Sequence, residues 1–289
     1  MLCELKEDEM FENHRQDRYV KVGNINTRFW TAGNRGQSVI LIHGLGGFVE
    51  SWQQNIDAFA EEHRVYALDL PGFGRSDKPA APYSIPYLAQ FVIDFLTTQG
   101  IRRATIVGNS LGGAIALELA FSCTDMVEKL VLVDAAGFGT KVHIALRLIT
   151  IPFIGECISR PSRKGTEKFL KTAFFDESMI TEEMIDFGLE MANLPGGGKA
   201  LLSTARSFLG FRGAKQTFIQ NVIANSNHLS CPTLIVWGRQ DKVLPIEGAH
   251  IAAKVIPNAE LQLFDACGHT PQLEHPEAFN SAVLQFLTG

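Results

Sequence analysis

A serine lies at the centre of the glycine-rich segment GNSLGG, residues 108–113. The apolar run 104–107 precedes this segment and the helix-like run AIALELAF follows it, so the serine sits in a sharp strand-to-helix turn. Side chains two residues to either side of the serine would collide in such a turn, which explains the glycines there. Ser110 is therefore a candidate nucleophile, and the N–H of Leu111 could face a developing oxyanion. Taken alone, the pattern also fits an ordinary βα turn.

An activated serine needs a base, and the base needs a carboxylate that orients it. Asp241 follows the apolar run 234–237, and His269 follows the run 261–264. Both residues then lie in loops at the carboxyl ends of predicted strands, where they can converge with Ser110 in spite of their separation in sequence. The chain order serine, aspartate, histidine is the order known for this kind of elbow. We therefore predict a triad of Ser110, Asp241 and His269.

A second glycine-rich loop, HGLGG at 43–47, follows the apolar run 39–42. Small residues let backbone N–H groups approach a substrate oxygen, so this loop is expected to complete an oxyanion hole. Leu45 is the expected donor beside Leu111, and Gly46 is the alternative. We expect a structural role for His43, in hydrogen bonds to loop backbone, because His269 already fills the place of the base.

The elements that must position these loops alternate between strand and helix. Short apolar runs typical of buried parallel strands occur at 39–42, 65–68, 104–107, 130–133, 234–237 and 261–264, and two strands joined at Gly23-Asn24 precede them. Helix-like stretches lie at 51–61, 86–99, 111–122, 246–255 and 276–287. This alternation predicts an α/β fold with a mostly parallel sheet and helices on both faces.

The alternation stops between about residues 138 and 228, where the periodicity is helical and is broken by Pro152, Pro161 and the turn PGGG at 195–198. A helical block between two core strands is best interpreted as a lid over the carboxyl ends of the strands. The expected organisation is a first part of the core at 1–137, a helical cap at 138–228 and a second part of the core at 229–289.

The chain resembles the α/β-hydrolase superfamily. The resemblance rests on HGLGG at 43–47, Ser51-Trp52, DLPGFGRSD at 69–77, GNSLGG at 108–113, GRQD at 238–241 and GHTPQLEHP at 268–276. It implies an eight-stranded sheet with a helical cap, the triad named above, an oxyanion hole from Leu45 and Leu111, and no metal or organic cofactor. Asp134 is the other position where this fold can carry its acid. Substrate contacts are expected at Gly44, Gly46, Asn109, Phe138 and Thr270.

Serine at the elbow disfavours haloalkane dehalogenases and epoxide hydrolases, which use aspartate there. The closest resemblances are carboxylesterases and lipases, and the hydrolases that cleave a carbon–carbon bond in meta-cleavage products. Asn109 and the cap pattern favour the second group. That group typically has a tryptophan after the histidine, where this chain has Thr270, and a cap arginine that grips the substrate carboxylate, where residues 191–195 read MANLP. Arg206 or Arg212 would have to replace that arginine.

Because a buried carboxylate needs a cation and a Phe- and Met-rich cap suits an uncharged acyl chain, we expect an esterase for small to medium apolar esters that works through an acyl-enzyme. A carbon–carbon hydrolase acting on vinylogous diketo acids is the first alternative. A ligand-binding protein on the same fold without catalysis is the alternative from another class.

Composition restricts the partners. Lys and Arg number 26 against 31 Asp and Glu, a net charge of −5, which disfavours binding to nucleic acid and to anionic membranes. No apolar stretch is long enough for stable membrane insertion. The charged start of the chain has no signal-peptide pattern, and the five scattered cysteines fit reduced thiols, so a cytoplasmic location is expected. A homodimer is compatible with these features.

Overall fold

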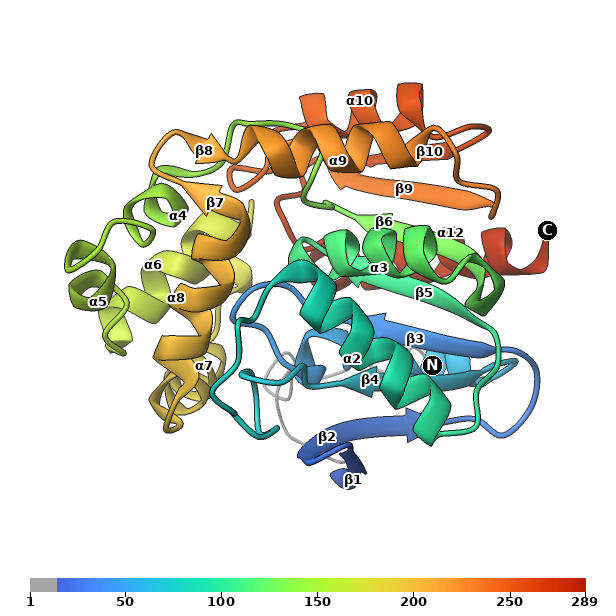
Figure 1. The fold of residues 1–289 in the computed structure, drawn as a ribbon, viewed down its shortest axis with the longest axis horizontal. Helices are drawn as coiled ribbons and strands as arrows, with labels where there is room; N and C mark the ends of the chain where they lie inside the picture. Colours follow the sequence, from blue (N-terminus) through green and yellow to red (C-terminus); the bar gives the residue numbers. More distant parts are fainter. Residues whose placement is uncertain (1–14) are drawn as a thin grey trace, which may run out of the picture.

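An eight-stranded sheet forms the centre of the protein in a computed structural model that describes residues 15–289 (Figure 1). Its strands lie in the order β1-β2-β4-β3-β5-β6-β9-β10. Their bounds are Arg18–Val22 (β1), Ile25–Ala32 (β2), Ser38–Ile42 (β3), Arg64–Leu68 (β4), Ala104–Asn109 (β5), Val127–Val133 (β6), Thr233–Gly238 (β9) and Glu260–Phe264 (β10). Strand β2 is antiparallel to its neighbours β1 and β4, and all other pairs are parallel. The predicted mostly parallel α/β fold is confirmed.

The two strands at the amino-terminal side form the expected hairpin. Val22 pairs with Ile25, and Gly23 between them has φ 58°, which glycine adopts without a steric penalty. Residues 1–14, which include most of the charged tail and Cys3, lie outside the described part of the chain.

The central strands are apolar on both faces because both faces are covered. In β3, Ile40 and Ile42 pack into one hydrophobic cluster, whereas Val39 and Leu41 pack into a second cluster on the opposite face. All four side chains are fully buried. The continuous apolar runs in the sequence therefore reflect the position of these strands between two layers of helices.

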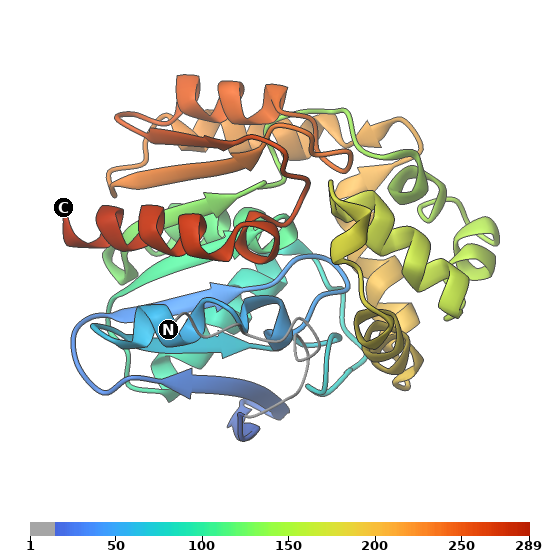
Figure 2. The same cartoon turned by 180° about the vertical axis from the view of Figure 1, so that it is seen from behind.

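One layer contains α2 (Ile85–Thr98), α3 (Leu111–Ser122), α9 (Gln216–Ser226) and α10 (Glu247–Val255). In Figure 1, α2, α3 and α9 lie in front of the sheet, and α10 lies at its upper edge. The layer on the other face contains η2 (Val49–Trp52), α1 (Ile56–Ala60) and α12 (Pro276–Thr288), as the reverse view in Figure 2 shows. Two short helices, η3 (Thr124–Met126) and α11 (Pro271–Glu274), lie in connections.

The prediction of one helix over 51–61 is wrong in detail, because two shorter helices, η2 and α1, divide that range. The buried side chain of Asn55 lies at the junction and donates to the carbonyl of Gln272 (3.0 Å) and to Oδ1 of Asn280 (2.9 Å). These bonds tie the break to the carboxyl-terminal part of the chain, so a long-range contact determines where the helix is interrupted.

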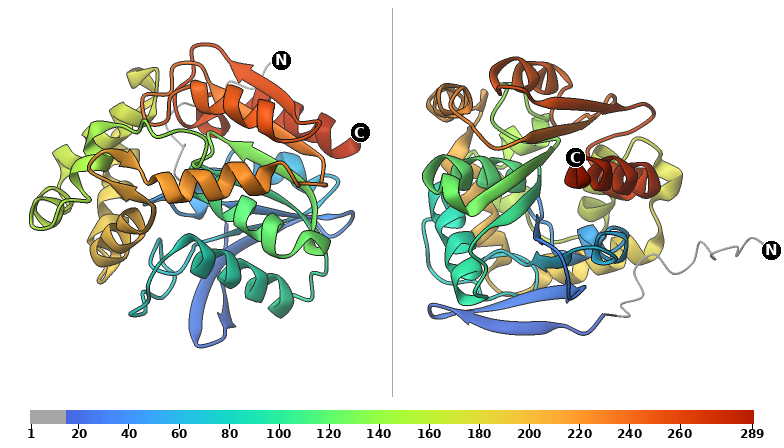
Figure 3. Two further views of the ribbon diagram at one scale, coloured as in Figure 1. Left: turned by 45° about the horizontal axis from the view of Figure 1, so that its top comes forward. Right: turned by 90° about the vertical axis from the view of Figure 1, so that its right-hand side faces the viewer.

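A largely helical segment is inserted between β6 and β9 and lies beyond one end of the sheet (Figures 1 and 3). Its elements besides α9 are α4 (Ile144–Leu148), α5 (Ile154–Ile158), α6 (Arg163–Ala173), η4 (Glu177–Met179), α7 (Glu182–Asn193), α8 (Gly197–Phe208) and the strands β7 (Leu209–Gly210) and β8 (Gly213–Ala214). The range 138–228, predicted as a cap, also includes α9, which packs on the core helices α3 and α10. The division into core and cap stays a prediction.

Within residues 15–289, no helix is both long and apolar enough to cross a bilayer. The four cysteines of this range, Cys123, Cys157, Cys231 and Cys267, carry free thiols.

Candidate active site

Ser110 occupies the turn between β5 and α3 in a strained conformation. Its φ of 55° lies in the region that residues with a β-carbon rarely adopt. A β-carbon at Gly108 would overlap the carbonyl oxygen of Gly112, and one at Gly112 would overlap the carbonyl oxygen of Ile42. The two glycines are therefore required for close backbone packing. This agrees with the prediction that side chains at these two positions would collide in the turn.

Asp241 and His269 meet at the ends of the neighbouring strands β9 and β10. The Nδ1 of His269 lies 2.7 Å from Oδ2 of Asp241, and both residues are buried. The other carboxylate oxygen, Oδ1, accepts from the backbone N–H groups of Val243 (2.6 Å) and Leu244 (2.9 Å). A carboxylate fixed in this way places the imidazole proton on Nδ1 and leaves Nε2 free to act as a base.

The serine turn is joined directly to the histidine loop. The amide of Asn109, next to Ser110, donates to the carbonyl of His269 (3.1 Å) and to that of Val133 (3.3 Å). Predicted as a substrate contact, Asn109 thus uses its amide nitrogen to hold three loops together. A substrate contact of its side chain stays a prediction.

Asp134, the alternative acid, lies beside the pair but does not hold the histidine. Its Oδ1 accepts from the N–H of Gly238 (3.0 Å), and its fully buried Oδ2 has no partner within the described residues. Burial, and next the charge of Asp241, raise the pKa of Asp134 well above its usual range. Burial therefore favours the protonated form of Asp134, and Asp241 is the acid bonded to His269.

Asp134, Asp241 and His269 form the one group within residues 15–289 whose ligand atoms lie close enough together to hold a metal ion, within 4.8 Å of one another. Both oxygens of Asp241 are already engaged, with His269 Nδ1 and with two backbone amides. This donor set fits a hydrogen-bonded acid–base pair better than a metal centre.

The loop at 43–47 lies beside the serine. Its chain turns at Gly46, with φ 76°, and Gly47 donates to the carbonyl of Gly44 (3.0 Å). A β-carbon at Gly44 would stand 3.2 Å from Cβ of Ser110, and one at Gly46 would stand 3.3 Å from Leu201 in α8. The inserted segment therefore covers this loop.

His43 bonds backbone groups on both sides, as expected. Its Nδ1 lies 2.7 Å from the carbonyl oxygen of Gly44, and its Nε2 accepts from the N–H of Leu70 (3.1 Å). Burial lowers the pKa of His43 to about 4, so the ring is neutral at physiological pH. Such a ring fixes the loop and is not available as a base.

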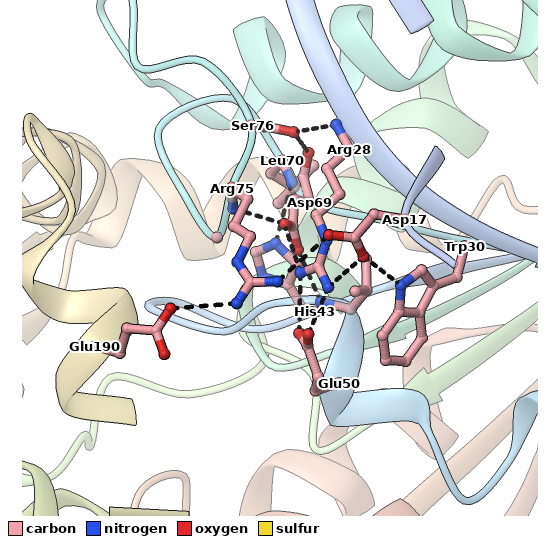
Figure 4. Close-up of polar contacts among 12 residues, drawn as sticks. Asp17, Arg28, Trp30, His43, Glu50, Asp69, Leu70, Arg75, Ser76 and Glu190 are labelled. Carbon is pink, nitrogen blue, oxygen red and sulfur yellow. Dashed lines mark hydrogen bonds and ion pairs between the residues drawn. The ribbon is translucent and has the colours of Figure 1, made fainter. Parts of the chain in front are cut away.

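A buried ionic cluster, which the sequence did not reveal, anchors the segments around this loop (Figure 4). The Nη2 of Arg28, a fully buried side chain of β2, lies 2.5 Å from Oε1 of Glu50 and 2.7 Å from Oδ1 of Asp17. Its Nη1 lies 3.3 Å from Oδ2 of Asp69. Asp69 in turn accepts from the backbone N–H of Val49 (2.8 Å). The cluster thus ties β2 to the segments that follow β3 and β4.

One arginine extends the cluster to the inserted segment. The backbone N–H of Arg75 donates to Asp69 (2.7 Å), and its guanidinium bonds Glu190 of α7 (3.2 Å). The same guanidinium lies 5.8 Å from the ring centre of Phe187, which also packs on Phe48. The DLPGFGRSD segment therefore connects the core to α7.

Glu274 is a second residue whose role the sequence did not reveal. It lies buried in α11, and its carboxylate accepts from the backbone N–H groups of Gly268 (3.0 Å), Thr270 (3.2 Å) and Phe175 (2.7 Å). Phe175 belongs to the inserted segment, so Glu274 ties that segment to both sides of His269. A glutamate within the motif GHTPQLEHP was the only signal for it.

Two further residues were predicted to touch substrate. Phe138 is buried in the larger hydrophobic cluster, with 1% of its surface exposed. Thr270 directs its hydroxyl to Oε1 of Glu274 (3.2 Å). The roles of both in substrate binding stay predictions.

Comparison with known proteins defines the class. The model of the alpha/beta hydrolase family matches residues 39–282, so the chain belongs to this family. The 2-hydroxy-6-oxo-6-(2'-aminophenyl)hexa-2,4-dienoic acid hydrolase of Metapseudomonas resinovorans is 33% identical over 97% of this chain and 93% of its own. A solved meta-cleavage product hydrolase of Pseudomonas fluorescens IP01 (CumD) is 28% identical and covers 94% of this chain and 97% of its own, with a TM-score of 0.81. A solved bacterial membrane phospholipase A is 25% identical and covers 95% of this chain and 86% of its own, with a TM-score of 0.78.

Removing the central cation should expose the role of the buried cluster. Arg28→Met leaves Glu50 and Asp69 buried without their counter-ion, and we expect a loss of about 3–5 kcal/mol in the free energy of unfolding at pH 7.5. The pKa of each carboxyl is already raised by burial, so protonation at lower pH relieves the repulsion and the loss should be smaller at pH 5. Urea unfolding at both pH values measures this. Lys21→Met, at an exposed position of β1, is the control, and an equal loss in both variants would contradict the expectation.

Asp134→Asn should stabilise the protein in a pH-dependent way. Folding favours the protonated form of Asp134. The loss of stability that Asp134 causes is therefore absent below the ordinary pKa that its carboxyl has in the unfolded chain, and it grows as the pH rises above that pKa. Asparagine is neutral throughout, and the gain over the wild type should therefore increase between pH 4 and pH 7 in thermal or urea unfolding. Asp94→Asn, on the exposed face of α2, is the matched control. A gain that is constant over this pH range would show that Asp134 is not held neutral.

Proposed function

We propose that the protein is a serine hydrolase with Ser110 as nucleophile, His269 as base and Asp241 as the orienting acid. The observation that carries this proposal is the bond between His269 and Asp241, at the loop that Asn109 ties to the serine turn. A buried carboxylate that fixes one ring nitrogen leaves the other free to accept a proton from a hydroxyl.

The expected reaction then follows the usual steps of acyl transfer. His269 takes the proton of Ser110 as Oγ attacks the carbonyl carbon, and Asp241 stabilises the imidazolium. The N–H of Leu111, at the first turn of α3, and that of Leu45 are the expected donors to the oxyanion, and each such donor is worth about 3 kcal/mol of the barrier. His269 protonates the leaving group and then activates the water that releases the acid.

The substrate proposed is an uncharged carboxylic ester, because the described residues offer no free buried cation for a carboxylate. Four basic residues of 15–289 are buried: Arg28, His43, His63 and His269. Arg28 is engaged by three carboxylates and His43 by backbone, and His63 precedes β4 at the opposite edge of the sheet.

The two arginines considered as substitutes offer no such cation. Arg206 bonds both oxygens of Glu156 (2.8 and 3.0 Å), and Arg212 is exposed in the turn between β7 and β8. An acid substrate would lose hydration here without gaining an ion pair.

Carbon–carbon hydrolysis is the second candidate, and the relatives favour it. Proteins named as hydrolases of dienoic acids and of meta-cleavage products resemble this chain over almost its whole length. A dienoic acid substrate carries a carboxylate. The choice between ester and carbon–carbon hydrolysis therefore depends on a cation to bind that carboxylate, and the described residues offer none. A homodimer and a cytoplasmic location stay predictions from the sequence.

Fluorophosphonate labelling tests whether the site is catalytic. We expect stoichiometric labelling of the intact protein and none of Ser110→Ala, together with a loss of at least about 10³-fold in ester turnover. Ser122→Ala, at the exposed end of the same helix, is the control and should label normally. If the intact protein takes no label, a ligand-binding protein without catalysis becomes the better description.

A parallel assay separates the two substrate classes. We expect kcat/KM for p-nitrophenyl esters of graded acyl length to exceed that for an aryl dienoate ring-fission product by at least about 10-fold, since one unpaired buried carboxylate costs more than 1.4 kcal/mol. The ester is followed by release of nitrophenol and the dienoate by loss of its visible absorbance. Faster turnover of the dienoate would replace the ester proposal with the second candidate.

A further inference from the structure

Exposed large apolar side chains concentrate on the inserted segment. Within residues 15–289, seven of the eight such side chains belong to it, and the eighth is Tyr19 in β1. The seven are Ile144, Phe153, Ile154, Ile158, Phe169, Phe175 and Phe211. Five of these, Ile144, Phe153, Ile154, Ile158 and Phe211, lie on α4, on α5 with its preceding residue, and in the turn between β7 and β8, and we call them the α4–α5 patch. Clustering of this kind marks an interaction surface.

The patch lies at the outer end of the inserted segment. In Figures 1 and 2, α5 is the element farthest from the sheet, and α4 lies beside it. Phe211 is joined to α4 by Arg147, whose Nε donates to the carbonyl of Phe211 (2.7 Å) and whose guanidinium lies 5.4 Å from the ring centre. The patch is therefore one surface formed by two parts of the chain.

The backbone itself holds the most exposed member outward. Phe153 is 86% exposed, and its φ of 66° is one that a residue with a β-carbon rarely adopts. The N–H of Ile154 closes a tight turn by donating to the carbonyl of Pro152 (2.8 Å). The most exposed ring of the patch is therefore carried by a residue in a strained backbone conformation.

The charge around the patch is opposite to that of the whole protein. Residues 141–171 contain seven Lys and Arg and two Glu, a net of +5, whereas the complete chain has a net charge of −5. Of the two glutamates, Glu156 is bonded by Arg206, and of the seven cations Lys141, Arg163 and Lys171 are themselves paired with acids that lie outside this range. The exposed cations Arg160, Lys164 and Lys168 form no ion pair with any residue of 15–289.

We propose that the α4–α5 patch is a peripheral binding surface for an anionic phospholipid bilayer. Aromatic and aliphatic side chains flanked by unpaired Lys and Arg enter the headgroup region together, the apolar groups through burial and the cations through attraction to anionic lipids. A second copy of the chain fits less well, because a symmetric contact would bring two positively charged segments together. The net negative charge of the rest of the chain is repelled by the same bilayer and would orient the protein with this segment towards it.

Co-sedimentation with vesicles tests the proposal. We expect the full chain to bind vesicles of phosphatidylcholine with roughly 30 mol% phosphatidylglycerol at least about 10-fold better than vesicles of phosphatidylcholine alone. Raising NaCl from about 0.1 M to about 0.5 M should remove most of this preference. Binding does not depend on Ser110, so failure of the proposed function leaves this result unaffected.

Variants separate the two contributions. Phe153→Ser with Ile154→Ser should weaken binding to both kinds of vesicle by at least about 10-fold, and Lys164→Glu with Lys168→Glu should remove the preference for anionic vesicles. Tyr19→Ser, an exposed aromatic residue on β1, is the matched control and should bind like the wild type. Thermal unfolding of each variant establishes that it is folded.

Three outcomes would overturn the proposal. One is the absence of binding to anionic vesicles, and another is unchanged binding by folded Phe153→Ser with Ile154→Ser. The third is a dimer in sedimentation equilibrium that this double variant dissociates while vesicles are not bound, which would assign the patch to a second copy of the chain.

Discussion

Six parallel strands, β4, β3, β5, β6, β9 and β10, end at one edge of the sheet, and their common register is the constraint on which the site depends. Ile42 pairs with Gly108, Gly108 with Leu132, and Phe264 with Gly238, so the loops after these strands leave from the same line. Three residues from distant parts of the chain can meet there without any local preference for one another. A shift of one strand would separate them.

Buried charges near this edge are stable only because each has a partner or loses its charge. Arg28 is held by three carboxylates, and Asp241 has both oxygens bonded. No cation of residues 15–289 pairs with Asp134, and burial beside Asp241 raises its pKa and so favours its protonated form. Under the proposed function the same electrostatic reasoning favours a neutral substrate, whereas the Metapseudomonas resinovorans relative is named as the hydrolase of a dienoic acid.

The inserted segment combines two contrasting surfaces. Its inner side contacts the core through Glu274 and Arg75 and covers the loop at Gly46 with Leu201. Its outer side exposes apolar side chains on α4 and α5, and the cations Arg160, Lys164 and Lys168, which follow α5 in the chain, form no ion pair with any residue of 15–289. The net charge of the chain, −5, does not reveal the positive charge of this segment, because it sums the charges of the whole molecule. Net charge therefore disfavours attraction to anionic membranes for the molecule as a whole and not for this segment.

The sequence by itself determined the fold and the candidate triad. Apolar runs of strand length, glycines around Ser110 and the order of Asp241 and His269 are signals carried by the chain itself, independent of its long-range contacts. The tertiary structure alone decided which acid bonds the histidine, that Arg28 has three partners, and that Glu274 ties the inserted segment to the histidine loop. It also decided where the helix predicted at 51–61 breaks. These features depend on contacts between residues far apart in sequence, for which spacing along the chain carries no information.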